Sequence, residues 1–431
     1  MRKIFAAVLS TLLLFFRLCT PLQCQTHTVT IPFCGEEAAI PTENTQTPVN
    51  TENAENSQTA EAADTLDLSA PSAILMEAST GTILYEKASA TQLAPASVTK
   101  VMSMLLIFEA LSAGKIQLTD EVTVSEHAAG MGGSQVFLEP GEIQTVETLV
   151  KCISVASAND AVVAMAEFVS GSEEAFVQQM NEKAASLGME NTHFVNCCGL
   201  DDPNHYTCAR DIAIMSRELI TRHPQVFDYC NIWQEDITHT TKKGSFSFTL
   251  SNTNKLLKQY PYATGLKTGS TSQAKFCLSA TATKDNMTLI AVIMAAENSK
   301  LRFADATKLL EYGFSTTSIY EDKIRGNTCQ IPVKKGVSDV LTAQCTGDFS
   351  YLSGSGENLA NVKKETQLPK ELTAPVKKGD VVGQIVYRLG EKELGTVSLE
   401  ATQDIKAAGF GDYYQKMVYQ FFLAQKNPSK Q

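Results

Sequence analysis

The spacing of apolar and polar residues predicts a domain with strands at both of its ends and helices between them. The stretch SAILMEASTGTILYEKAS, residues 72–89, holds two β-rich runs around a turn sequence, Ser-Thr-Gly, and therefore predicts a hairpin. Strand-like runs return later as GLKTGST, AKFCLSATA and MTLIAVIMAA, within residues 265–296. Between these two groups, helical patterns are predicted at about 96–112, 145–156, 160–169, 172–187 and 208–223.

Particular residues mark the ends of these predicted helices. Thr145 and Ser172 are predicted N-caps, Gly188 is predicted to follow a helix C-terminus, and Pro224 ends the last segment. A further amphipathic helix is predicted over RFADATKLLEYGF, which follows the last strand-like run. The economical architecture is α+β, with one antiparallel sheet built from both sequence ends, helices packed on it and a helical block inserted.

Two further segments follow this domain, which we assign to residues 68–318. Residues 322–403 consist of short runs containing Val and Ile, separated by turns such as Lys-Lys-Gly, which predicts a small all-β domain. Residues 406–426 carry an aromatic-rich apolar stripe at helical spacing. Such a stripe is usually a core face, but after a complete β domain an amphipathic helix at a membrane surface is the favoured interpretation. The stripe comprises Phe410, Tyr413, Tyr414, Met417, Val418, Phe421 and Phe422.

The first 67 residues are predicted to lie outside the folded part. Residues 1–24 resemble an export signal, because two basic residues precede an apolar run that is short for a membrane span. The cleavage site is not defined, so an uncleaved anchor stays open as an alternative. Residues 25–67 are predicted to be a disordered acidic spacer, since residues 35–64 contain no aromatic residue, lysine or arginine. We therefore expect an exported protein at the outer face of the cytoplasmic membrane or in the cell wall.

The net charge of the chain indicates which classes of partner it can bind. The formal net charge is -11, and the sequence pI is about 5.2. A nucleic-acid-binding protein would need a basic surface, so nucleic acid is excluded as an expected partner. The chain is 43% hydrophobic and 19% charged, which is typical of a soluble globular protein with sizeable cores.

Eleven cysteines are many for an exported protein. None forms a C-x-x-C motif or a Cys/His spacing typical of zinc, so no metal site is predicted. Cys152 and Cys277 lie in apolar runs and are expected to be core residues. In CQIPVKKGVSDVLTAQC, folding about residue 337 places Cys329 opposite Cys345 on paired strands. This register predicts a disulfide, with two free thiols as the alternative.

Ser97 and Lys100 form an S-x-x-K pair in APASVTKVMSML. Pro95 suits a first helical turn, so the serine lies near a helix N-terminus and shares a face with the lysine. The apolar run that follows implies that Lys100 is buried, and burial lowers a lysine's pKa. A neutral lysine can activate a serine nucleophile. Alone, however, the motif is weak, and a helix start with a lysine reaching to solvent is the alternative.

Two later motifs strengthen the hypothesis. SVASANDAVVAM places Ser157 and Asn159 between apolar helices, where unpaired polar groups would be costly; a helix cap is the alternative. GLKTGST places Lys267, Thr268 and Gly269 at the start of a strand. The lysine and threonine there suit a substrate carboxylate, and the glycine lets a substrate backbone approach the strand edge.

In this order, S-x-x-K, S-x-N and K-T-G are the motif set of the penicillin-recognising serine enzymes. The chain resembles a low-molecular-mass penicillin-binding protein of the D-alanyl-D-alanine carboxypeptidase family. The likeness covers about residues 70–315 and includes GGSQVFLEPGE, HYTCARDIA and SNTNKLL. It implies a β-lactamase/transpeptidase-like fold for this domain. Ala158 stands where the family usually has glycine, and most members lack the spacer.

The resemblance implies a role for each matching residue. Ser97 would be the nucleophile, Lys100 its general base, and Ser157 the relay that returns a proton to the leaving D-alanine. Asn159 would orient the peptide, and backbone N–H groups of Ser97 and Ser270 would form the oxyanion hole. Three residues would hold the terminal carboxylate: Lys267, Thr268 and, more loosely, Arg302.

The implied partners are a peptidoglycan stem pentapeptide as substrate and β-lactam antibiotics as covalent inhibitors, with no cofactor. Two alternatives stay open. A class A β-lactamase would need an E-x-x-x-N segment between the last two motifs, and none of the seven glutamates between Asp160 and Leu266 has asparagine four residues on. A cell-wall-binding protein without turnover is not favoured, because every catalytic position is filled.

Overall fold

The computed structural model describes residues 66–242, 244–354 and 356–426. The predicted export signal and nearly all of the predicted spacer lie outside these residues.

The N-terminal domain is built on a five-stranded antiparallel sheet in the order β2-β1-β9-β8-β7. Its strands come from both sequence ends of the domain, which confirms the predicted α+β architecture. The central strand, β9, is almost entirely buried because the sheet is covered on both faces. The strands are β1 (Ser72–Glu77), β2 (Ile83–Lys87), β7 (Ala263–Thr271), β8 (Lys275–Lys284) and β9 (Met287–Ala296).

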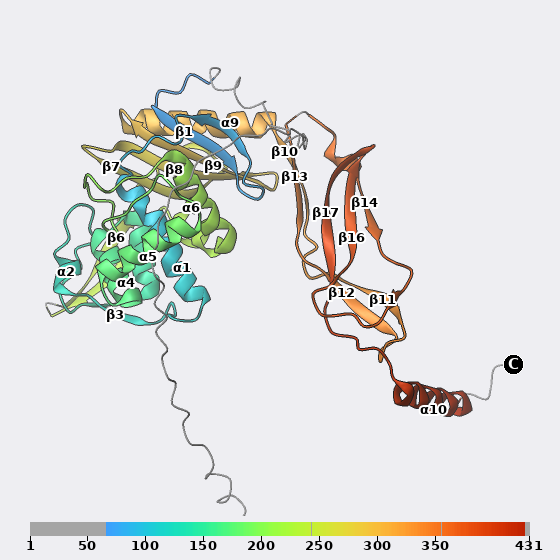
Figure 1. Cartoon of the computed structure of the whole chain (residues 1–431). Helices are drawn as coiled ribbons and strands as arrows, with labels where there is room; N and C mark the ends of the chain where they lie inside the picture. The colour runs from blue at the N-terminus through green and yellow to red at the C-terminus, as the bar shows by residue number, and fades with distance from the viewer. Residues whose placement is uncertain (1–65, 243, 355, 427–431) are drawn as a thin grey trace, which may run out of the picture. The chain divides into compact units, whose positions relative to one another are not determined.

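Helices cover both faces of the sheet (Figure 1). Helix α9 (Ser299–Thr316) packs against one face around a core that includes Leu75, Leu289 and Leu309. The inserted helical block covers the other face and shares a larger core with it. The block comprises α1 (Lys100–Ser112), α2 (Glu126–Ala129), α3 (Val146–Lys151), α4 (Asn159–Ser170), α5 (Glu173–Ser186), α6 (Ala209–Arg222) and α7 (Phe227–Cys230). The short helix α8 (Leu256–Gln259) instead buries Leu256 in the core on the α9 side.

The predicted helix ends are confirmed. The hydroxyls of Thr145 and Ser172 accept hydrogen bonds from Thr148 N and Ala175 N, and so cap α3 and α5. Pro224 opens a short 3₁₀ turn just beyond the end of α6. One feature was not predicted: α3 continues as a π-helix over Cys152–Ala156, directly before the second motif.

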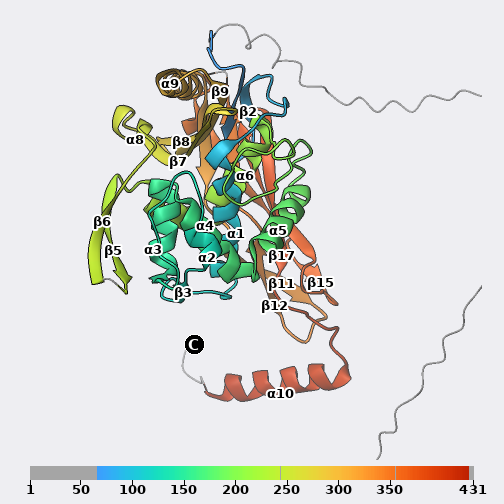
Figure 2. The same ribbon diagram turned by 90° about the vertical axis from the view of Figure 1, so that its left-hand side faces the viewer.

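Two small antiparallel pairs were also not predicted. They are β3 (Glu121–Thr123) with β4 (Ile143–Thr145), and β5 (Gln234–Thr241) with β6 (Gly244–Ser251). The second pair forms a hairpin that stands apart from the main sheet in Figure 2. Its alternating β-branched and aromatic residues carried a strand signal that sequence reasoning passed over.

The C-terminal domain is all-β, as predicted, with its own apolar core that includes Ile331, Leu341 and Tyr387. A six-stranded sheet has the order β14-β16-β17-β12-β11-β15, and β10 pairs with β13. Strands β11 and β15 are parallel, and the remaining pairs are antiparallel. The strands are β10 (Ser318–Asp322), β11 (Thr328–Lys334), β12 (Val340–Cys345), β13 (Phe349–Ser353), β14 (Val362–Gln367), β15 (Leu372–Thr373), β16 (Val381–Leu389) and β17 (Lys392–Ala401).

The predicted disulfide between Cys329 and Cys345 is wrong. Both thiols are free, and Cys329 lies opposite Ala343 in the β11–β12 pair. The turn between the strands is centred one residue earlier than we predicted, so the register differs by two residues. Cys345 therefore occupies a diagonal position on the same face, where Cα atoms are too far apart for a disulfide without backbone movement.

Helix α10 (Phe410–Lys426) forms the tail. Five residues of its predicted stripe are largely exposed: Phe410, Tyr413, Tyr414, Met417 and Phe421. Among the described residues, no helix combines the length and the apolar composition that crossing a membrane requires.

Candidate active site

Ser97 lies in a 3₁₀ turn, Ala96–Thr99, that leads directly into α1. Ala96 has a φ of +48°, a left-handed conformation that an L-residue adopts at a cost and that is found at functional turns. The Ser97 side chain is half-buried. The turn thus presents the hydroxyl at the start of α1, as the sequence predicted.

Lys100 is fully buried in the first turn of α1. Its Nζ lies 3.1 Å from Ser97 Oγ, and it donates hydrogen bonds to Asn159 Oδ1 at 2.6 Å and to the Cys198 carbonyl at 2.8 Å. Burial lowers the pKa of Lys100, while the nearby thiols and Asp160 oppose this shift only in part. The lysine is therefore fixed against the serine by two oxygen acceptors.

The second motif, which contains Ser157 and Asn159, lies between the π-helix and α4. Ser157 is itself in the left-handed conformation, with φ +63°, and ends the π-helix. Asn159 begins α4, and its Nδ2 donates to the Gly132 carbonyl at 2.6 Å. Both amide atoms of Asn159 are thus engaged within the protein, whereas we expected the amide to face a substrate carbonyl.

Lys267 and Thr268 lie on β7, an edge strand of the main sheet. Lys267 is buried, and its Nζ donates to Ser157 Oγ at 2.8 Å and to the Thr268 carbonyl at 3.0 Å. Burial and the neighbouring Lys100 lower its pKa well below the ordinary value. The Thr268 hydroxyl lies 2.7 Å from that of Thr253.

Gly269 lets β7 approach the turn that carries Ser97. A Cβ atom at this position would lie 2.7 Å from Pro95 O and 2.9 Å from Ser97 N, which is closer than Cβ atoms come to backbone atoms. On the other side of the turn, a Cβ at Gly199 would overlap the Ala96 carbonyl. The two glycines therefore allow two backbone segments to enclose the nucleophile turn.

Arg302, on α9, lies behind the third motif. Its guanidinium donates to the carbonyls of Gly269 at 3.1 Å and Cys277 at 3.0 Å, and it stacks between the rings of Phe276 and Phe303. Burial lowers the pKa of Arg302 to about 10. The cation thus supports β7 and β8 from the α9 side.

His205 forms a hydrogen bond with Thr99, the last residue of the turn that carries Ser97. Val195 N–H donates to its Nδ1, so its Nε2 carries the proton and donates to Thr99 Oγ1 at 2.8 Å. Burial lowers the pKa of His205 to about 4, which keeps the imidazole neutral.

The three motifs, which are 60 and 110 residues apart in sequence, meet at one place. Ser97, Lys100 and Asn159 form one hydrogen-bonded group, and Ser157, Lys267 and Thr268 form a second group beside it. Sequence reasoning missed two partners, the Cys198 carbonyl and the Thr253 hydroxyl. A carbonyl carries no residue-type signal, whereas Thr253 lies within SNTNKLL, a segment that already contributed to the resemblance.

A serine hydroxyl beside a buried lysine, with a second serine hydroxyl held by a lysine of strand β7, defines a serine acyl-transfer enzyme of the penicillin-recognising class. Comparisons with known proteins specify the family. Residues 56–298 match the family model described as D-alanyl-D-alanine carboxypeptidase, and residues 314–407 match the C-terminal domain of penicillin-binding protein 5.

The relatives agree with these matches. The D-alanyl-D-alanine carboxypeptidase DacF of Bacillus subtilis is 45% identical over 342 residues, covering 79% of this chain and 87% of the relative. DacC of Escherichia coli is 34% identical, covering 82% and 90%. Penicillin-binding protein 5 of Haemophilus influenzae, a solved structure, aligns with a TM-score of 0.64 and 33% identity, covering 79% and 98%. The chain belongs to the D-alanyl-D-alanine carboxypeptidase family of serine peptidases.

Proposed function

We propose that this chain removes the terminal D-alanine from peptidoglycan stem pentapeptides through an acyl-enzyme on Ser97. The single observation that carries the proposal is the fully buried Lys100 Nζ at 3.1 Å from Ser97 Oγ. A base in hydrogen-bonding reach of a serine is what nucleophilic catalysis requires.

The contacts of Lys100 fit a neutral amine acting as the base. A neutral amine has two N–H bonds and one lone pair. The Asn159 side-chain oxygen and the Cys198 carbonyl accept the two N–H bonds, which directs the lone pair toward the Ser97 hydroxyl. The lowered pKa of Lys100 favours this neutral form. The Ser97 proton can then pass to Nζ as Oγ attacks the carbonyl carbon of the penultimate D-alanine.

Ser157 and Lys267 are positioned to complete the first half-reaction. The tetrahedral intermediate collapses when its C–N bond breaks, and the leaving nitrogen takes up a proton. We assign Ser157 as the relay for this proton, because Lys267 holds its hydroxyl at 2.8 Å. Water then hydrolyses the Ser97 ester and releases the shortened peptide.

Lys267 and Thr268 are the proposed contacts of the terminal carboxylate. A substrate carboxylate restores the charged state of Lys267, which burial and Lys100 disfavour in the free enzyme. β7 is a sheet edge, so the peptide can add to it as a further strand. Gly269 keeps that edge close to Ser97 N, one of the two proposed oxyanion-hole donors.

β-Lactam antibiotics are proposed to acylate the same serine. Attack by Ser97 opens the lactam ring, so the broken amide nitrogen stays attached to the acyl group and no leaving group departs. Penicillins would therefore inhibit by forming a persistent ester.

The experiment that tests this function is D-alanine release from a purified pentapeptide. The wild-type chain should release one D-alanine per peptide, and Ser97→Ala should release none while it keeps its circular dichroism spectrum. Release by Ser97→Ala at the wild-type rate would remove Ser97 from the mechanism.

We further propose that α10 rests on the outer surface of the cytoplasmic membrane. Its exposed stripe, including Tyr414 and Met417, supports an interfacial helix. Lys416 of α10 donates to the Gly336 carbonyl at 2.9 Å, so we do not propose it as a lipid contact.

Flotation with anionic liposomes tests the membrane proposal. A chain starting at residue 68, which lacks the predicted export signal, should float with the vesicles. Met417→Glu should lower the recovered fraction, whereas Gln415→Glu, an equal change of charge at a polar position of α10, should lower it less. Equal losses from both variants would contradict a role for the stripe.

A further inference from the structure

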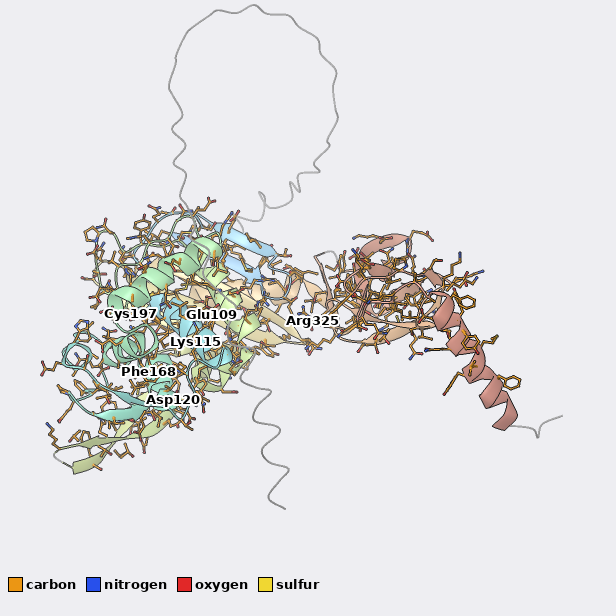
Figure 3. The ribbon with its side chains drawn as sticks, turned by 60° about the horizontal axis from the view of Figure 1, so that its bottom comes forward. Glu109, Lys115, Asp120, Phe168, Cys197 and Arg325 are labelled. Carbon is orange, nitrogen blue, oxygen red and sulfur yellow. The ribbon has the colours of Figure 1, made fainter. Side chains whose placement is uncertain are left out.

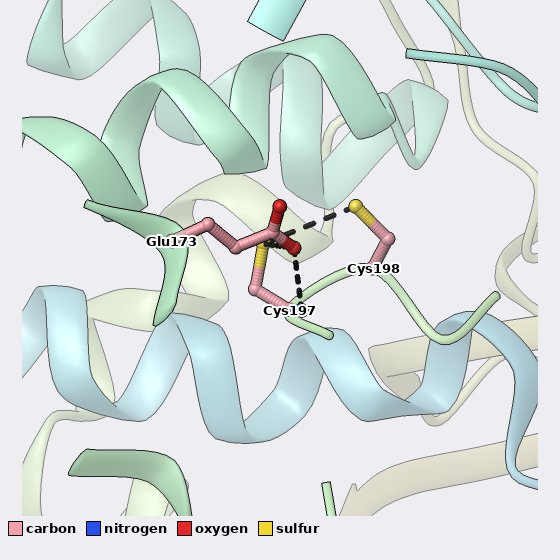
Figure 4. A group of neighbouring side chains, drawn as sticks. All are labelled: Glu173, Cys197 and Cys198. Carbon is pink, nitrogen blue, oxygen red and sulfur yellow. Dashed lines mark hydrogen bonds between the residues drawn. The ribbon is translucent and has the colours of Figure 1, made fainter. Parts of the chain in front are cut away.

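Three metal-ligating side chains converge beside the active site in the helical block, where Cys197 is labelled in Figure 3. Cys197 and Cys198 are adjacent in sequence, and Glu173, the first residue of α5, points its carboxylate at them (Figure 4). One ligand atom from each of the three lies within 4.8 Å of the other two. Among the described residues, no other group of three such side chains converges in this way.

We propose that Glu173, Cys197 and Cys198 bind a thiophilic divalent cation such as Zn²⁺. Tetrahedral zinc with Zn–S bonds of about 2.3 Å and a Zn–O bond of about 2.0 Å separates its sulfur ligands by about 3.8 Å, and sulfur from oxygen by about 3.5 Å. Here the two Sγ atoms are 3.9 Å apart, and Cys197 Sγ is 3.3 Å from Glu173 Oε1. Two of the three donor pairs thus already have nearly the separations that the metal would impose, and the third pair, Cys198 Sγ and the Glu173 carboxylate, lies within 4.8 Å.

The backbone around the two cysteines is fixed at all four of its polar groups. Cys197 N donates to Glu173 Oε1 at 3.1 Å, and the Cys197 carbonyl accepts from Ser103 Oγ at 2.7 Å. Cys198 N donates to Asn196 Oδ1 at 3.2 Å, and the Cys198 carbonyl accepts from Lys100 Nζ. Because each peptide group is held, the thiols are preorganised and little ordering is needed when a metal binds.

The carboxylate is oriented from the solvent side. Glu173 Oε2 accepts a hydrogen bond from His127 Nε2 at 2.9 Å, while Oε1 faces the thiols. The thiols are buried, the Glu173 side chain is 14% exposed and His127 is 57% exposed, so a cation would enter between these last two residues. An outer partner that orients a ligating carboxylate is a common feature of metal sites, and solvent would supply the fourth ligand.

Metal binding at this site is coupled to the release of protons from the thiols. Burial raises the pKa of Cys197, with the neighbouring thiol and carboxylate adding to the effect, so the metal must displace the proton of this thiol. Binding would form two metal–sulfur bonds and one metal–oxygen bond, and would release one proton from each thiol to the solvent. The bound metal would then clamp the segment whose carbonyl accepts from Lys100.

The test uses the full chain, purified under reducing conditions and stripped of metal with a chelator. Cd²⁺, a spectroscopic substitute for Zn²⁺, should produce a thiolate-to-metal charge-transfer band that saturates at one ion per chain. Added Zn²⁺ should remove this band by competition and should raise the melting temperature, because it binds the folded state alone.

Variants localise the site. Cys197→Ser and Cys198→Ser should each abolish the band, whereas Cys329→Ser, which alters a half-buried thiol of the β domain, should leave band and stoichiometry unchanged. If a buried serine prevents folding, Glu173→Gln keeps both thiols and should weaken Zn²⁺ binding by about tenfold or more, since even outer-shell changes cost 10–100-fold. Three results would overturn the proposal: no band, a band that persists in Cys197→Ser, or a Cys197–Cys198 disulfide in the reduced and purified chain.

Discussion

The cores of the two domains differ in how many polar and charged side chains they bury. The N-terminal domain buries two lysines, Lys100 and Lys267, and the Nζ atom of each donates hydrogen bonds to oxygen atoms of the protein. The described part of the C-terminal domain buries no charged side chain, and its core is apolar apart from the hydroxyls of Ser353 and Tyr387. Buried polar groups are costly unless they are paired, so they define a geometry that apolar packing alone does not.

This difference predicts that matched disruptions will have different consequences in the two interiors. A change in the polar interior should alter the chemistry, whereas a change in the apolar interior should alter stability and leave the chemistry intact.

The largest effect is expected from Lys100→Ala. Removing the base should slow acylation by a fluorescent penicillin by about 10²–10⁴-fold, the usual contribution of general-base catalysis. Stopped-flow fluorescence gives the rate, and circular dichroism checks the fold. Acylation near the wild-type rate would mean that Lys100 only packs.

A smaller, substrate-dependent effect is expected from Lys267→Gln. The change removes the proposed partner of the terminal carboxylate, which is worth about 1–3 kcal/mol, or several-fold to several-hundred-fold. The loss in kcat/KM should be much larger for a peptide ending in a free carboxylate than for its amide. Equal losses on both peptides would remove Lys267 from that role.

The pH dependence of stability tests the buried polar network at His205. The pKa of His205 is about 4 in the folded chain, compared with 6.5 for an exposed histidine, so between these values the unfolded chain binds the extra proton. The contribution of His205 is therefore complete above pH 6.5 and is lost as the pH falls toward 4. The total change is on the order of 3 kcal/mol.

Urea unfolding between pH 7 and pH 5 measures this effect. His205→Gln should flatten the dependence on pH, whereas the exposed His193→Gln should preserve it. An unchanged slope in His205→Gln would show that other groups cause the acid sensitivity.

The smallest effect on chemistry is expected from Leu341→Ala in the apolar interior of the β domain. Leu341 is fully buried, so its truncation should destabilise that domain by about 2–5 kcal/mol. The rate of penicillin acylation should not change. Val340→Ala, at the adjacent exposed position, should stay within about 0.5 kcal/mol of wild type. A loss of acylation in folded Leu341→Ala would contradict the separation of the two interiors.

The same contrast explains what could be predicted from the sequence. The residues of the three motifs were predicted together, because S-x-x-K, S-x-N and K-T-G occur in the order that the family resemblance requires. The β11–β12 register was predicted wrongly by two residues. A shift of two keeps every side chain on its own face of the sheet, so the apolar pattern fits either register equally well.

Other parts of the site could not be predicted because no side chain encodes them. The acceptor at Cys198 is a backbone carbonyl, and neither alanine nor serine is a residue type that predicts the left-handed conformation found at Ala96 and Ser157. The convergence of Glu173 with the two adjacent cysteines likewise depends on the fold, since a helix start and a loop supply its members.

Mapping the penicillin adduct shows directly whether Ser97 is the nucleophile. The wild-type chain is labelled with a penicillin, digested and sequenced by mass spectrometry. We expect one adduct, on Ser97, and none in Ser97→Ala. An adduct on any other residue of the wild-type chain, or continued labelling of folded Ser97→Ala, would contradict this expectation.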